Sequence, residues 1–88
     1  MITKSIEIKL PGGLEARPVA ELVQLASRFD STVHIEAQSK KVNAKSIMGM
    51  MTLSLSSGEE VTVIADGSDE RDAVAGMESF LMGNLQLS

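Results

Sequence analysis

The sequence predicts an α+β fold with the element order β-α-β-β-α-β-α, in which three helices cover one face of a four-stranded antiparallel sheet. Two observations predict it. Apolar and polar residues alternate within residues 2–10, 32–44 and 61–65, as in strands with one buried face. In the segments between them the apolar spacing is helical, and helices on a single face of one sheet would bury both kinds of apolar surface. Residues 1–88 are expected to form one domain.

The first predicted strand covers residues 2–10, and its buried face carries Ile2, Ile6, Ile8 and Leu10. The segment Pro11-Gly12-Gly13 ends it, because proline removes a backbone donor and glycine permits a sharp reversal. The first helix is predicted over residues 16–28, where Pro18 is tolerated in the first turn. The apolar stripe of this helix consists of Val19, Leu22, Val23, Ala26 and Phe29.

The second and third strands are predicted over residues 32–37 and 40–44, with a tight turn at Gln38-Ser39 between them. A short helix over residues 46–53 follows, and Ser46 is a favourable N-cap for it.

The fourth strand is predicted over residues 61–65 and is ended by the turn sequence Asp66-Gly67-Ser68-Asp69. The last helix begins in this region, because the carboxylates of Asp69, Glu70 and Asp72 favour the positive end of a helix dipole. Its core face carries Ala73, Val74, Met77, Phe80 and Leu81.

Composition excludes several function classes. The chain has no cysteine, so it can form neither disulfides nor thiolate metal sites, and we expect no metal and no cofactor. A net charge of −4 with two phenylalanines and no tryptophan or tyrosine argues against direct binding of nucleic acid. Because no apolar run approaches the roughly 20 residues that span a bilayer, and none resembles a secretory signal, we expect a cytoplasmic protein without membrane contact.

Two segments resemble the functional segments of the HPr family, the small phosphocarriers of the bacterial sugar phosphotransferase system. They are Gly-Gly-Leu-Glu-Ala-Arg-Pro at residues 12–18 and Asn-Ala-Lys-Ser-Ile-Met-Gly-Met-Met at residues 43–51. The resemblance implies the HPr-like open-faced β-sandwich, in agreement with the periodicity. It also implies that Glu15 stands where the family carries its phosphohistidine, and that Ser46 matches the family's regulatory serine. The chain resembles most closely the catabolite-repression branch, which also lacks the histidine.

This resemblance implies a regulator rather than a catalyst or a phosphohistidine carrier. HPr kinase/phosphorylase would phosphorylate Ser46 with ATP, and the phosphoserine form would bind the transcription regulator CcpA as a corepressor, with the DNA contacts made by CcpA. The residues expected to contact partners are Glu15, Arg17, Ala20, Lys45, Ile47, Met48 and Met51.

Glu15 admits more than one interpretation. A glutamate can form an acyl phosphate, but its neighbours supply no metal site of the kind that carboxylate phosphorylation usually uses. It can also be a carboxylate that stabilises a helix start by about 0.3–1 kcal/mol, or a fixed negative charge beside Arg17. The chain's one histidine, His34, is predicted to be an outward-facing strand residue without a role in phosphorylation.

The short helix cannot bury all of its apolar residues. We expect Met50 and Leu53 to enter the core and Ile47, Met48 and Met51 to stay exposed, as a docking surface would require. The alternative is that Ser46 only caps the helix and the methionines only fill the core. Phosphorylation would add about −1.5 to −2 charges beside the exposed residues.

Two rival functions remain open at the level of sequence. One is a phosphocarrier HPr whose histidine is replaced by Glu15, and the other is an HPr-fold interaction module that is never phosphorylated. We expect a monomer or a weak homodimer, in which Pro11-Gly12-Gly13 would serve as a hinge for exchange of the first strand between chains.

Overall fold

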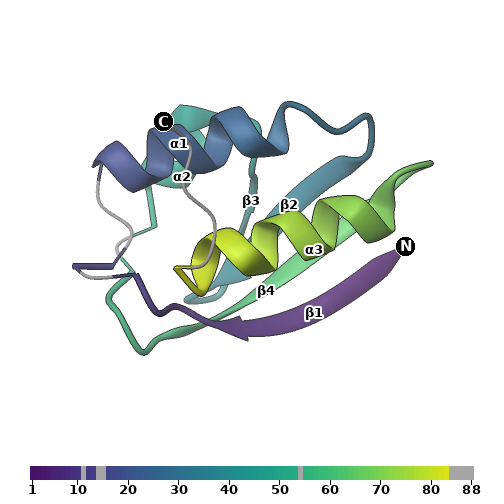
Figure 1. The fold of residues 1–88 in the computed structure, drawn as a ribbon. Helices are drawn as coiled ribbons and strands as arrows, with labels where there is room; N and C mark the ends of the chain where they lie inside the picture. The colour runs from purple at the N-terminus through teal and green to yellow at the C-terminus, as the bar shows by residue number, and fades with distance from the viewer. Residues whose placement is uncertain (11, 14–15, 54, 84–88) are drawn as a thin grey trace.

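The structure, a computed structural model, describes residues 1–10, 12–13, 16–53 and 55–83. Its elements follow the predicted order, and the three helices lie on one face of a four-stranded antiparallel sheet (Figure 1). The elements are β1 (Ile2–Glu7), α1 (Ala16–Ala26), β2 (Thr32–Ala37), β3 (Lys40–Asn43), α2 (Ile47–Met51), β4 (Glu60–Asp66) and α3 (Glu70–Leu81). The described helices are too short and too polar to cross a lipid bilayer.

The sheet has the strand order β1-β4-β2-β3, so β4 is central and pairs with both β1 and β2. In this register Val63 lies opposite Lys4 on one side and Ile35 on the other, and Ile35 in turn lies opposite Val42 of β3. Since side chains alternate along each strand, the register places every second residue of β2 and β4 on the face that the helices cover, and leaves Ile64 on the other face. Buried residues of that face are Val33, Ile35, Ala37, Val61, Val63 and Ala65.

The helices complete the core with the residues that their periodicity predicts. Leu22 of α1 and both Met77 and Leu81 of α3 are fully buried, and α1 packs against α3. The predicted stripe of α1 needs two corrections. Leu25 is buried but is not part of the predicted stripe, while Val23 and Phe29 belong to that stripe and are only half-buried.

Several elements are shorter than predicted, because residues near their ends make backbone hydrogen bonds that do not continue the helix or the sheet. β1 ends at Glu7 rather than residue 10, since the Lys9 N–H donates to the carbonyl of Leu81 at 2.8 Å. α1 ends at Ala26 rather than residue 28, since the Arg28 N–H donates to the Leu25 carbonyl three residues back. Similarly, α2 covers residues 47–51 rather than 46–53, and β3 ends at Asn43.

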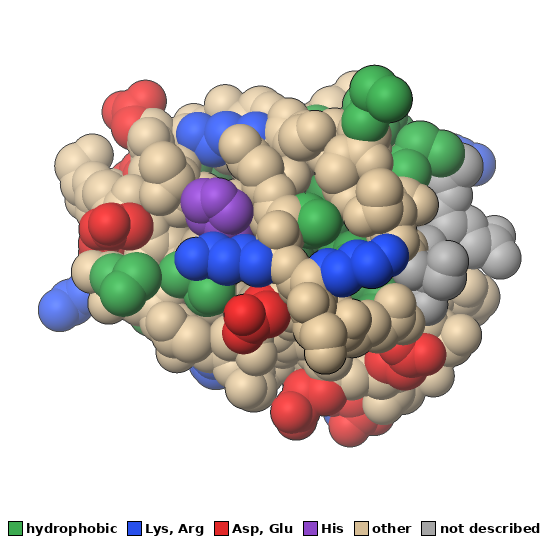
Figure 2. Space-filling model, turned by 180° about the vertical axis from the view of Figure 1, so that it is seen from behind, with side chains coloured by type: hydrophobic (Ala, Val, Ile, Leu, Met, Phe, Trp, Pro, Cys, Tyr) green, Lys and Arg blue, Asp and Glu red, His purple; other side chains and the backbone are tan. Residues whose placement is uncertain are grey.

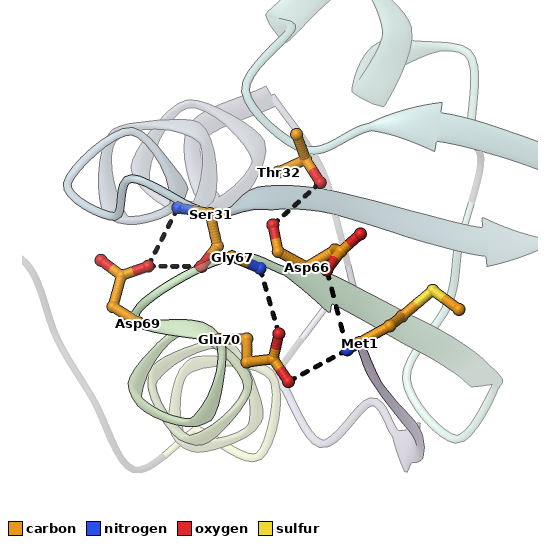
Figure 3. Close-up of polar contacts among 7 residues, drawn as sticks. All are labelled: Met1, Ser31, Thr32, Asp66, Gly67, Asp69 and Glu70. Atoms are coloured by element: carbon orange, nitrogen blue, oxygen red, sulfur yellow. Dashed lines mark hydrogen bonds and ion pairs between the residues drawn. The ribbon is translucent and has the colours of Figure 1, made fainter.

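A carboxylate ties the α1–β2 loop to the start of α3 (Figure 3). Asp69 accepts hydrogen bonds from the N–H groups of Asp30 and Ser31, each at 2.9 Å, and from the Ser31 hydroxyl. It also occupies the N-cap position of α3, at the helix start where the sequence predicts a carboxylate, although its side chain makes no cap hydrogen bond. Gly67 lets the loops meet, because a Cβ there would lie 2.6 Å from the Ser31 Cα.

These donors change the acidity of the two carboxylates at this end of the molecule. The Ser31 hydroxyl, followed by the Asp30 N–H, lowers the pKa of Asp69. For Glu70 the Gly67 N–H is the main cause of a lowered pKa, and the amino group of Met1, 3.1 Å away, adds to the effect. Both groups therefore favour the ionised state in the fold.

Replacement of Asp69 by asparagine should reduce stability at neutral pH and weaken the dependence of stability on pH. A lowered folded pKa means that the stabilisation is complete above the unfolded value of about 3.9 and is lost as pH falls through the folded value. Urea unfolding at pH 7 and pH 3 should therefore show that the free energy of unfolding decreases less on acidification for Asp69→Asn than for the wild type.

Asp72→Asn is the matched control, because Asp72 is an exposed carboxylate in the first turn of the same helix. It should keep the acid sensitivity of the wild type. An equal decrease in unfolding free energy between pH 7 and pH 3 for Asp69→Asn and the wild type would contradict the role assigned to Asp69.

Candidate functional site

Ser46 caps α2, as its residue type predicts. Its backbone is extended, with φ −108° and ψ 113°, and its Oγ accepts a hydrogen bond from the Gly49 N–H at 3.2 Å. Its carbonyl accepts from the Met50 N–H at 2.9 Å, which closes the first helical turn. The half-buried side chain thus holds a hydroxyl oxygen at a fixed place beside the first turn of α2.

The five residues of α2 are divided between core and surface. Met50 is fully buried, and Leu53, just after the helix, is 3% exposed. The exposed fractions of the other large side chains confirm the prediction, with Ile47 at 45%, Met48 at 80% and Met51 at 57%. We call these three residues the α2 patch. The rear view shows hydrophobic side chains protruding over the α2 end of the molecule (Figure 2).

Lys45 has a structural contact that the sequence did not reveal. Its Nζ donates to the Phe29 carbonyl at 2.7 Å, and the residue is half-buried. Its N–H also donates to the Asn43 side chain at 2.8 Å. Lys45 therefore joins the turn before α2 to the loop after α1, in addition to any partner contact. A bond between residues 16 positions apart has no local sequence pattern, which explains why it was missed.

The other expected contact residues lie on α1 or just before it. Arg17 is exposed, and its Nε is 4.0 Å from the Glu21 Oε1, a distance that leaves the guanidinium largely in solvent. Ala20 is half-buried on the same helix. Because α1 packs against α2, the structure brings the helix that carries Arg17 and Ala20 beside the α2 patch. Glu15 lies outside the described residues, so its interpretation stays a prediction.

The segment before α1 is closely packed at Gly13. This residue has φ +75°, and a Cβ there would lie 2.4 Å from the Leu55 carbonyl oxygen. Only glycine fits such a position without a backbone shift. This packing places Gly13 against the loop that precedes β4.

His34 lies apart from this surface, on the face of the sheet that the helices leave uncovered. It is half-buried in β2, opposite Ile64 and Asn43 on the neighbouring strands. Figure 2 shows the single histidine among basic and polar side chains on that face. Within the described part of the chain, no three His, Asp or Glu side chains are grouped so as to hold a metal ion.

The surface around α2 thus offers a serine hydroxyl, backbone N–H groups and exposed thioether and alkyl groups. A hydroxyl held at a helix start can accept a phosphoryl group, and the adjoining N–H groups can bind its oxygens. The apolar groups can be buried by a second protein. This combination suits a modifiable docking surface.

Comparison with known proteins gives a consistent family assignment. A family model described as the PTS HPr component phosphorylation site matches residues 2–82. The HPr-like protein Crh of Halalkalibacterium halodurans is 49% identical over 81 residues, covering 92% of this chain and 96% of that protein. Crh of Bacillus subtilis is 49% identical over 81 residues as well, with coverage of 92% and 95%.

Solved structures match over nearly the whole chain. The HPr-C-His protein from Thermoanaerobacter tengcongensis has a TM-score of 0.89 and 45% identity, covering 96% of this chain and 94% of that one. Bacillus subtilis Crh, described as a swapped and intertwined dimer, has a TM-score of 0.77 and 46% identity, with coverage of 99% and 100%. Sequence and fold point to the same group of proteins.

Alanine substitution of two methionines on α2 should distinguish the buried face of the helix from its exposed face by the effect on stability. Met50→Ala should cost about 2–5 kcal/mol of unfolding free energy, because it empties a fully buried site. Met48→Ala should change stability by no more than about 0.5 kcal/mol, because its side chain lies in solvent. Chemical denaturation measures both, and a larger loss for Met48→Ala than for Met50→Ala would contradict the orientation of α2.

Proposed function

The chain belongs to the HPr family, and we propose that it is a regulatory member that acts in carbon catabolite repression. Its similarity to HPr-like protein Crh over 92% of its length supports this role. In the proposed cycle HPr kinase/phosphorylase transfers a phosphoryl group from ATP to the Ser46 hydroxyl. The phosphorylated protein then binds the transcription regulator CcpA as a corepressor, and CcpA makes the DNA contacts.

The observation that carries the proposal is that a hydroxyl which caps α2 is followed directly in the sequence by the exposed α2 patch. Ser46 immediately precedes Ile47 and Met48, and all three lie at one end of α2. The Gly49 N–H, which already donates to Ser46 Oγ at 3.2 Å, is placed to donate to a phosphate oxygen. Phosphorylation therefore adds charge to this surface with little rearrangement of α2.

The phosphate and the α2 patch have separate roles in binding. Full burial of an exposed apolar side chain is worth roughly 1.5–3 kcal/mol, and Ile47, Met48 and Met51 can contribute only the part of this that matches their exposed fractions of 45%, 80% and 57%. Part of the gain offsets the loss of rigid-body freedom. A hydrogen bond to a charged group adds about 1.5–3 kcal/mol. The patch alone gives weak association, and the phosphate makes binding depend on the kinase.

We propose that the protein does not transfer phosphoryl groups through histidine and is not itself an enzyme. Its one histidine, His34, lies on the uncovered face of the sheet rather than at the start of α1. Glu15 stands at the position of the family's phosphohistidine. Arg17, Ala20 and Lys45 would then contact partners beside the α2 patch.

For its assembly and location, we propose a cytoplasmic monomer that forms a homodimer at high concentration. In the structure β1 pairs with β4 of the same chain, while Bacillus subtilis Crh is described as a swapped dimer. Exchange of β1 between chains would open the segment around Gly12-Gly13, where both glycines have positive φ.

Phosphorylation of Ser46 should be required for binding to CcpA. After incubation with HPr kinase/phosphorylase and ATP, intact mass should show one added phosphate on the wild type and none on Ser46→Asn. Calorimetric titration should then show CcpA binding at least about tenfold tighter for the phosphorylated protein, since one charge-assisted hydrogen bond has this effect.

Ser46→Asn is chosen because asparagine keeps the N-cap while it removes the hydroxyl. A family HPr phosphorylated in parallel confirms that the kinase is active. Absence of phosphate on this chain under those conditions, or equally tight CcpA binding by Ser46→Asn and the phosphorylated wild type, would refute the proposal.

A further inference from the structure

The six methionines of the chain differ sharply in access to solvent. Met48 and Met51 of the α2 patch are 80% and 57% exposed, whereas Met50 in the same helix and Met77 in α3 are fully buried. Met1 is also exposed, but its amino group contacts Asp66 and Glu70 at the other end of the molecule (Figures 1 and 3). With no cysteine in the chain, thioethers are its only sulfur groups.

We propose that Met48 and Met51 form a reversible oxidation site that switches off docking at the α2 patch. This inference rests on the proposed function, because it concerns the same surface. The oxidant is a peroxide such as hydrogen peroxide. A sulfur lone pair attacks one oxygen of hydrogen peroxide, an S–O bond forms and the O–O bond breaks, and the proton of the attacked oxygen passes through solvent to the departing hydroxide, which leaves as water. Sulfur is oxidised by two electrons and the peroxide is reduced by two.

The consequence for binding follows from the chemistry of the product. A methionine sulfoxide is polar and carries a strong hydrogen-bond acceptor, so burying it against an apolar partner surface leaves that acceptor without water. Two of the three side chains of the α2 patch would change in this way, and only Ile47 would stay apolar. The affinity contributed by the patch is therefore lost while the phosphate on Ser46 remains.

The fold is protected from the same reaction by the arrangement of α2. Met50 lies next to Met51 in sequence but points into the core, where a peroxide in solvent cannot reach its sulfur. Oxidation of the surface pair thus leaves the contacts that anchor α2 intact. Because methionine sulfoxide reductases remove the oxygen, the change is reversible.

The test starts with phosphorylated protein treated with dilute hydrogen peroxide, which catalase and desalting then remove before untreated CcpA is added. Trypsin releases residues 46–71 as one peptide, so fragment ions must assign oxygen among Met48, Met50 and Met51. We expect oxygen on Met48 and Met51 before Met50 or Met77. Calorimetry should show CcpA affinity reduced by at least about tenfold, and recovery after treatment with reductase.

The matched control is the double variant Met48→Leu and Met51→Leu, which keeps the patch apolar but removes both oxidisable sulfurs. The CcpA affinity of the phosphorylated double variant is measured with and without peroxide, and the two values should agree although Met1 is still oxidised. Equal oxidation rates for Met50 and Met51, or unchanged CcpA affinity after both surface methionines are oxidised, would overturn the inference. Failure of untreated phosphorylated protein to bind CcpA would instead refute the proposed function, and the peptide map alone would then decide whether the oxidation site exists.

Discussion

The properties of the candidate site depend on the burial of one side chain, that of Met50. A helix of five residues has little intrinsic stability, so α2 is held by its anchor in the core and by the cap at Ser46. Once Met50 points inward, the helical geometry leaves Ile47, Met48 and Met51 in solvent. The exposed apolar surface is thus the direct result of how a short helix must be fixed to a small core.

Outside α2, two polar contacts fix the loop after α1, and one of them comes from the turn that precedes α2. Near α2, the Lys45 ammonium joins the preceding turn to the Phe29 carbonyl in the loop after α1. At the start of α3, Asp69 binds the backbone of the same α1–β2 loop through Asp30 and Ser31. The loop after α1 therefore receives contacts from the turn before α2 and from the start of α3, which follow the ends of β3 and β4 that lie beside the start of β2.

Local patterns predicted the element order and the two faces of α2, because alternation and helical spacing depend on neighbouring residues. The N-cap at Ser46 was likewise predictable from residue type and was confirmed by its bond to Gly49. Contacts between distant residues were not predictable. The bond between Asp69 and Ser31 joins residues 38 positions apart, and the Lys9 N–H donates to the distant carbonyl of Leu81 rather than to a neighbouring strand. Neither this bond nor the end of β1 at Glu7 can therefore be read from a local pattern.

We propose that the phosphorylated protein docks through the α2 patch and the adjacent helix α1. The most direct test is titration of ¹⁵N-labelled, Ser46-phosphorylated protein with CcpA, followed by amide NMR signals. Docking at this surface should broaden the signals of α2 and of the neighbouring face of α1 first, while those of the uncovered sheet face around His34 persist. Early broadening on the sheet face, with α2 unaffected, would contradict it.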